Sequence, residues 1–195
     1  MLVWCYHSDA SGNTPDIDIA RLLLDSPNFK HLATTMPHLK FILPTAPTQP
    51  VTMNAGIPMP SWYDITGLDE RSNENCAGID RSAARVKQIL EHEHAANGLP
   101  YRRMVVAGFS QGGALSLFTG LQLPRELKLG GIVVMSGYLP AARVFDITPG
   151  LGDTPIMHCH GEADVRLCFF VLSASRSCVV FTNHVLCALD SQWWL

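Results

Sequence analysis

Apolar residues along the chain fall into two patterns, short continuous runs and runs with helical spacing. The continuous runs predict buried strands at 2–6, 41–43, 105–107, 131–135 and 155–159. Helical spacing predicts amphipathic helices over three segments: from Ile17 to before Pro27, near 77–96 with an end signal at Asn97-Gly98, and after Ser110. Strands alternating with helices predict an α/β fold, a doubly wound and mostly parallel sheet with both faces covered.

One long segment interrupts this alternation. Between 44 and 62 the chain carries five prolines, at positions 44, 47, 50, 58 and 60. Proline lacks a backbone donor and breaks helices, so we expect a long ordered loop passing over the sheet. Loops of this length are commonly functional.

Composition narrows the class of protein. A chain of 195 residues with 47% hydrophobic and 16% charged residues predicts a single globular domain over 1–195. The net charge of −3 and the lack of a Lys/Arg cluster argue against nucleic-acid binding.

No apolar run reaches the length of a membrane span. Met1–His7 is too short and too poor in basic residues for a signal peptide, which predicts a cytoplasmic protein.

Cysteine usage points the same way. The six Cys form no C-x-x-C pair and no metal-ligand spacing with histidine. In a cytoplasmic protein the expectation is reduced thiols that pack as small apolar side chains. We therefore expect no bound metal and no cofactor.

The segment 103–117 carries the strongest chemical signal. An apolar run leads into Gly108-Phe-Ser-Gln-Gly112, and helical spacing follows at once. This G-x-S-x-G pattern between a strand and a helix is typical of a nucleophile elbow, which lifts the Ser110 hydroxyl out of the sheet in a strained backbone conformation. The turn aims the backbone N–H of Gln111 at a developing oxyanion, with the helix dipole behind it. The alternative is a glycine-rich surface turn.

An acid partner is expected beyond Ser110, because α/β-hydrolases order their triad as Ser, Asp or Glu, then His. Asp164 follows the last predicted strand, at the carboxyl edge where catalytic groups collect in such sheets. Glu162 is a weaker candidate. The alternative is a solvated loop aspartate without a role.

The base is harder to assign. His184 is the one histidine after Asp164, so a complete triad would require it to accept the serine proton. It lies among apolar residues, where a histidine is more often part of the core than a base. His7, His158 and His160 precede Asp164 and fit the triad order badly.

Six segments together resemble the acyl-protein thioesterase and carboxylesterase family of α/β-hydrolases, in the order in which that family carries them. They are Pro44-Thr-Ala-Pro47, Pro50-Val-Thr-Met-Asn54, Met59-Pro-Ser-Trp-Tyr-Asp-Ile65, Gly108-Phe-Ser-Gln-Gly-Gly-Ala-Leu-Ser116, Ser136-Gly-Tyr-Leu-Pro140 and Cys159-His-Gly-Glu-Ala-Asp164. The resemblance covers residues 2–164.

The resemblance implies a serine hydrolase for carboxylic esters or thioesters of fatty acids, with Ser110 as nucleophile and Asp164 as acid. Implied substrates are S-acylated proteins, small acyl esters or lysophospholipids, with transient contact to a membrane surface. Trp62 and the proline loop would help to line the acyl site. Core packing is an equal and compatible alternative for Trp62.

The chain departs from the family in two places. The family's His-Gly-x-Gly-Asp loop, which supplies a second oxyanion N–H, is replaced by His7-Ser-Asp-Ala-Ser-Gly12. From Val165 onward nothing resembles the family, so we expect its late elements to be truncated or replaced.

Two alternatives to an active enzyme follow from these departures. The first is an inactive or impaired homologue that binds acyl chains or lipidated proteins, and the second is a truncated product that does not fold stably. For residues 165–195 we expect an atypical, poorly packed tail, loss of a late strand and its covering helix, and His184 beyond reach of Ser110.

Overall fold

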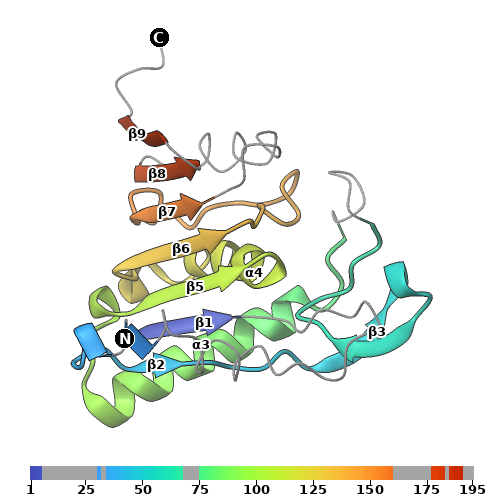
Figure 1. Cartoon of the computed structure of the whole chain (residues 1–195), viewed down its shortest axis with the longest axis horizontal. Coiled ribbons are helices and arrows are strands. Elements are labelled where there is room, and N and C mark those ends of the chain that lie inside the picture. Colours follow the sequence, from blue (N-terminus) through green and yellow to red (C-terminus); the bar gives the residue numbers. More distant parts are fainter. Residues whose placement is uncertain (6–29, 32–33, 68–74, 160–176, 183–184, 191–195) are drawn as a thin grey trace.

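The apolar runs form the strands of one sheet in the computed structural model, which describes residues 1–5, 30–31, 34–67, 75–159, 177–182 and 185–190. Within these residues the sheet has seven strands in the order β2-β1-β5-β6-β7-β8-β9 (Figure 1). Their bounds are β1 Leu2–Cys5, β2 Phe41–Ile42, β5 Val105–Phe109, β6 Gly131–Met135, β7 Ile156–Cys159, β8 Ser177–Thr182 and β9 Val185–Asp190. Neighbours from β2 to β8 are parallel and β9 is antiparallel to β8, which confirms the predicted, mostly parallel sheet.

Two long helices, α3 (Ile79–Asn97) and α4 (Gln111–Leu121), confirm two of the three predicted helices. Gly98 ends α3 in the left-handed conformation, with φ 62°, and its N–H donates to the His94 carbonyl at 2.9 Å. This is the helix end that Asn97-Gly98 predicted. The helix predicted from Ile17 lies outside the described residues.

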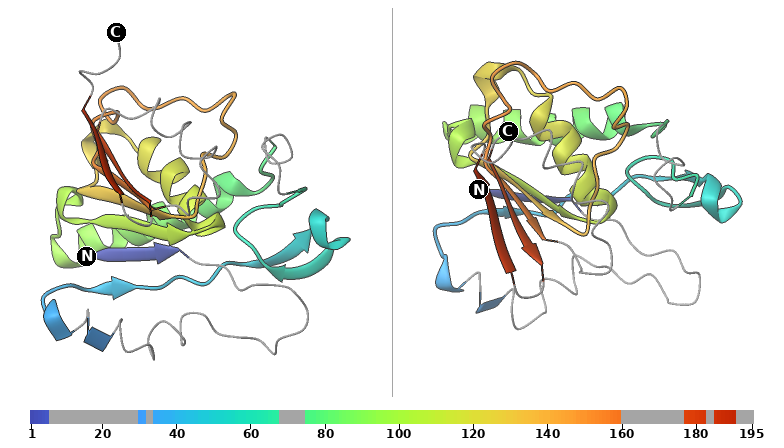
Figure 2. Two further views of the ribbon diagram at one scale, coloured as in Figure 1. Left: turned by 45° about the horizontal axis from the view of Figure 1, so that its top comes forward. Right: turned by 90° about the horizontal axis from the view of Figure 1, so that it is seen from above.

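Both helices lie on the same face of the sheet (Figure 2). The contacts of α4 show which strand residues point to this face. An added Cβ at Gly113 would lie 3.0 Å from Cγ1 of Val134, and one at Gly120 would lie 2.6 Å from Cδ1 of Ile132. Val134 and Ile132 therefore point toward α4, and we call this side of the sheet the helix face.

Residues of the helix face are almost completely buried. Val106 is 0% exposed, Val134 0% and Ile156 2%. The alternate residues of the same strands point to the opposite face, since side chains alternate along a strand. There Met157 is 40% exposed and Phe109 is 52% exposed. The packed core of the described residues lies between the sheet and its two helices.

The proline-rich segment contains a hairpin that its sequence did not predict. Strand β3 (Thr48–Val51) pairs in antiparallel fashion with β4 (Ile57–Pro60), so part of the expected long ordered loop is a two-stranded ribbon. Pro50 and Pro58 oppose each other in this pairing. A two-stranded ribbon consists of two edge strands, and edge strands tolerate proline because their outer side needs no donor.

The C-terminal part also contains more sheet than expected. Strand β8 pairs in parallel with β7, and β9 pairs with β8, so the expected loss of a late strand is wrong. The physical reason is composition: Val179, Val180, Phe181 and Thr182 are residues that favour strands, and Val185-Leu-Cys-Ala-Leu189 is a continuous apolar run. The expectation of poor packing concerns side chains that the structure does not describe.

The register of β8 and β9 pairs Thr182 with Val185. Only Asn183 and His184, which lie outside the described residues, connect the two strands. No helix among the described residues has the length and apolar character needed to cross a membrane.

Candidate functional site

Ser110 lies at the junction of β5 and α4, where the chain changes abruptly from strand to helix. Its backbone has φ 51° and ψ −119°, a conformation with positive φ that residues other than glycine rarely adopt. Such strain costs about 1–3 kcal/mol and is concentrated at functional sites. Its N–H donates to the Met135 carbonyl at 2.8 Å, and its half-buried side chain makes no capping hydrogen bond to α4. The local geometry is that of a nucleophile elbow.

Close backbone contacts hold this turn in place. A Cβ at Gly108 would lie 2.2 Å from the backbone carbon and oxygen of Gly112, so only glycine fits there. This contact accounts for the first glycine of the G-x-S-x-G pattern. Gly137 has a similar role, since its Cβ would lie 2.7 Å from Cγ1 of Val134 and 3.1 Å from the Ala114 nitrogen. Gly137 carried no local sequence signal for this packing.

The first turn of α4 supplies backbone donors beside Ser110. The first bond of the helix runs from the Ala114 N–H to the Ser110 carbonyl at 3.0 Å. The N–H groups of Gln111, Gly112 and Gly113 therefore have no acceptor within the helix, as at every helix N-terminus. These donors and the helix dipole favour negative charge near the Ser110 hydroxyl.

The Gln111 side chain points away from this turn and bonds to the segment Ser61–Tyr63. Its Oε1 accepts the Trp62 backbone N–H at 2.9 Å, and its Nε2 donates to the Tyr63 carbonyl at 2.7 Å and to the Ser61 hydroxyl at 2.9 Å. Gln111 is 1% exposed. The sequence predicted a role for its backbone only, because these partners lie about fifty positions away.

Trp62 is fully buried in the core, which confirms the packing alternative for this residue. Its backbone carbonyl accepts a hydrogen bond from the Ser82 hydroxyl of α3. Its indole Nε1 has no hydrogen-bond partner among the described residues. A direct contact of Trp62 with an acyl chain stays a prediction.

Two tyrosines, Tyr63 of this segment and Tyr138, bond to each other through their hydroxyl groups. The hydroxyls of Tyr63 and Tyr138 lie 2.7 Å apart. Burial raises the pKa of Tyr138 to about 12 and raises that of Tyr63 well above its usual value near 10. Both phenols are therefore neutral at physiological pH and neither is a base there.

The end of β7 carries two further groups that could take part in chemistry. His158 is fully buried, and its Nε2 lies 3.2 Å from the Gly137 carbonyl, which indicates a structural role. Burial raises the pKa of the Cys159 thiol, so at neutral pH it is protonated and a poor nucleophile. Among the described residues, no three His, Cys, Asp or Glu side chains lie close enough together to hold a metal ion.

The other predicted site residues cannot be placed. Asp164 and Glu162, the base candidate His184, and the loop 7–12 all lie outside the described residues. The structure therefore brings together Ser110, Gln111 and the backbone of Trp62.

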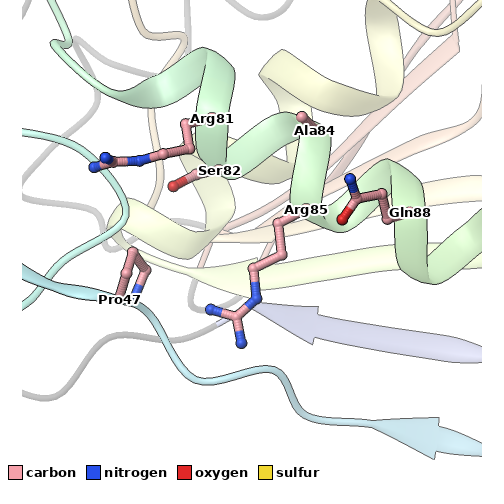
Figure 3. Close-up of a pocket in the computed structure, with 6 residues that line it drawn as sticks. All are labelled: Pro47, Arg81, Ser82, Ala84, Arg85 and Gln88. Carbon is pink, nitrogen blue, oxygen red and sulfur yellow. The ribbon is translucent and has the colours of Figure 1, made fainter.

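Two hollows among the described residues lie against α3, and neither is lined by residues of the elbow. One, of about 430 Å³, is lined by Pro47, Arg81, Ser82, Ala84, Arg85 and Gln88 (Figure 3). Arg85 donates to the Thr45 carbonyl at 2.8 Å and Arg81 to Gln49 Oε1 at 3.1 Å. These arginines brace the hairpin segment against the helix. The second hollow, of about 480 Å³, is adjacent and shares Arg81.

The chain is similar to known proteins in both sequence and structure. The sequence profile of the phospholipase/carboxylesterase family matches residues 27–182. The match continues beyond Asp164 to the end of β8, so the expectation that nothing resembles the family after this residue is wrong. The pairing of β8 with β7 gives the reason, since this segment keeps the apolar pattern of a strand in the sheet.

Several relatives share this match. The chain is 43% identical over 127 residues to acyl-protein thioesterase 1 homolog 1 of Dictyostelium discoideum, covering 65% of this chain and 56% of the relative. It is 42% identical over 154 residues to acyl-protein thioesterase 1 of Yarrowia lipolytica, covering 76% of this chain and 65% of the relative. The chain thus spans less than two thirds of the length of these relatives.

Solved structures agree on the fold. Zea mays acyl-protein thioesterase 2 superposes with a TM-score of 0.68 at 27% identity, covering 93% of this chain and 82% of that one. Arabidopsis thaliana SOBER1 gives 0.66 at 26% identity, covering 93% and 86%. The elbow, the parallel sheet and these matches together show that the chain has the α/β-hydrolase fold and belongs to the phospholipase/carboxylesterase family.

Proposed function

We propose that this chain is a serine hydrolase of the acyl-protein thioesterase type that forms an acyl-enzyme on Ser110. The observation that carries the proposal is the strained Ser110 backbone between β5 and α4, with positive φ and a hydroxyl that does not cap the helix. Strain of this kind persists where surrounding structure enforces it, and here Gly108 and Gly137 do so.

The proposed reaction is acyl transfer in two steps. The Ser110 oxygen attacks the carbonyl carbon of an ester or thioester, and the resulting oxyanion is stabilised by the Gln111 N–H. The thiol or alcohol leaves with a proton from the base. Water then hydrolyses the acyl-enzyme, which releases a carboxylic acid and restores Ser110. These steps require no cofactor.

The substrate class follows from the relatives' names. Several are acyl-protein thioesterases, which supports S-acylated proteins as substrates. Small acyl esters and lysophospholipids extend this class. The cytoplasmic location that the sequence predicts is part of the same proposal.

Asp164 as acid and His184 as base complete the proposed triad. Three strand spacings separate the ends of β5 and β8, about 14 Å in a regular sheet. His184 follows the end of β8 by two residues in the sequence, and β8 ends at the same edge of the sheet as β5. A base on this short connection must bridge that separation.

A second candidate function follows from the short β8–β9 connection, Asn183 and His184, which would have to span this separation. If the separation is not bridged, Ser110 lacks its general base, and the chain is an impaired homologue that binds acyl chains or lipidated proteins. We expect low hydrolytic activity on this ground, because general bases contribute typically 10²–10⁴-fold.

A fluorophosphonate probe separates the candidates. An active elbow predicts covalent labelling at Ser110, abolished in Ser110→Ala with an unchanged melting temperature. Acyl binding alone predicts stabilisation by a fatty acid without labelling. Labelling that persists in Ser110→Ala would place the nucleophile elsewhere, and neither response would refute both candidates.

A further inference from the structure

The side chain of Gln111 links the elbow to a segment that precedes it by about fifty residues. We propose that this side chain is a positioning residue, which fixes the segment Ser61–Tyr63 against the first turn of α4 so that the two move as one unit. Its effect on the reaction rests on the proposed function. Its effect on the mobility of the segment does not.

The orientation of the Gln111 amide follows from its partners. The Trp62 N–H can only donate and the Tyr63 carbonyl can only accept, so Oε1 faces the first at 2.9 Å and Nε2 the second at 2.7 Å. One side-chain amide therefore bridges two successive residues of the backbone, as a neighbouring strand would. Since Gln111 is 1% exposed, water cannot readily replace either bond.

Other contacts fix the segment on its far side. Gln49 Nε2 donates to the Ser61 carbonyl at 2.6 Å, the Ser61 N–H donates to the Pro47 carbonyl at 2.9 Å, and the Ser82 hydroxyl bonds to the Trp62 carbonyl. These contacts come from the hairpin and α3. Among the described hydrogen bonds, those that join the segment to α4 are made by Gln111.

The same residue carries the backbone N–H next to Ser110. Loss of these side-chain bonds would release the segment from the residue that begins α4 and carries the proposed oxyanion donor. Displacements of about 1 Å in such a site can cost about 10²-fold in rate. The side chain thus ties the position of this donor to the buried core around Trp62.

Amide hydrogen exchange tests whether Gln111 restrains the segment Ser61–Tyr63, and this measurement does not depend on enzymatic activity. Gln111→Met keeps the length of the side chain and removes its hydrogen bonds to Ser61, Trp62 and Tyr63. We expect the Trp62 amide and its neighbours to exchange at least tenfold faster in this variant. Unchanged exchange at 61–64 would overturn the proposal.

Ser116→Ala is the matched control. Ser116 is also fully buried in α4, and its hydroxyl donates to the Gly112 carbonyl at 2.7 Å. It makes no hydrogen bond to the Ser61–Tyr63 segment. Its loss should leave exchange at 61–64 unchanged, and an equal acceleration in this control would mean general destabilisation of α4, which overturns the proposal.

Gln111→Glu gives a readout that a purely structural role would not move. A protonated carboxyl group can accept from Trp62 and donate to Tyr63, whereas a carboxylate can only accept. Burial favours the protonated form at mildly acidic pH. Relative to Gln111→Met at the same pH, Gln111→Glu should approach wild-type protection at pH 5 and lose it at pH 8. No difference between the two variants at pH 5 would overturn the bridge.

Fluorophosphonate labelling tests the catalytic half. We expect Gln111→Met to label Ser110 10- to 100-fold more slowly than the wild type, with Gln111→Glu partly rescued at pH 5. Faster exchange with unchanged labelling would overturn the positioning role. Absence of labelling in the wild type would overturn the proposed function, while the exchange result would still decide whether Gln111 holds the segment.

Discussion

The two faces of the central sheet are built from the same strands and differ sharply in packing. On the helix face, Val134 and Ile156 are at most 2% exposed, whereas Met157, next to Ile156 in β7, is 40% exposed on the other face. Two glycines on the helix face allow close backbone contacts at the elbow. Gly108 lies against the backbone of Gly112, and Gly137 lies against the backbone nitrogen of Ala114. Among the described residues, the close contacts that hold the Ser110 backbone in its strained conformation therefore lie on the helix face.

The largest expected effect comes from adding a side chain at Gly108, where two backbone segments are in contact. Gly108→Ala would place a Cβ 2.2 Å from the Gly112 backbone, which cannot move aside without displacing α4. We expect a loss of at least about 4 kcal/mol in the free energy of unfolding, a size reserved for severe packing defects. Urea denaturation followed by circular dichroism measures it. A loss below about 1 kcal/mol would show that the helix face tolerates movement at the elbow.

A matched pair in β7 sharpens the comparison directly. Ile156→Ala removes a side chain that is 2% exposed and should cost about 2–5 kcal/mol. Met157→Ala removes one of similar size from the opposite face, and should cost less than about 1 kcal/mol. Equal costs in thermal and urea denaturation would mean that both faces are packed alike in solution.

The third prediction concerns the phenol pair beside the elbow. In an unfolded chain both phenols titrate near pH 10, while in the fold burial raises the pKa of Tyr138 to about 12. The folded state therefore retains this proton longer, so its contribution is fully present below pH 10 and is lost as the pH rises toward 12. Stability should fall by about 1.4 kcal/mol per pH unit in this window.

Denaturation at pH 9, 10 and 11 measures this slope, with Tyr138→Phe as the control. The variant should show a flatter dependence on pH. The same slope in the variant and the wild type would assign the effect to other groups.

Much of the fold could be predicted from local pattern. Apolar runs gave β5, β6 and β7 to within a few residues, and G-x-S-x-G predicted the turn at Ser110, because these features depend on neighbours in the sequence. The hairpin at 48–60 was missed since its prolines indicated a loop. The β8–β9 pair was missed because residues 165–195 contain no glycine or proline to mark the turns between strands.

The site was predictable only in part, for a physical reason. The contacts of Gln111 with Ser61 and Tyr63 join positions about fifty residues apart, and no local pattern encodes them. The same holds for Gly137, whose role depends on the distance to α4. The motif supplied the chemistry of Ser110, while tertiary packing supplies its support.

The position of β1 bears on how this chain is made. Leu2–Cys5 are synthesised before the strands they pair with, β2 and β5, whose residues lie some forty and one hundred positions later. At about 5–20 residues per second, β5 follows roughly 5–20 s after β1. Until β5 has been made, β1 lacks the partner on one of its two edges, and late, long-range pairings of this kind fold slowly. Chaperones that shield nascent apolar strands would therefore act on β1.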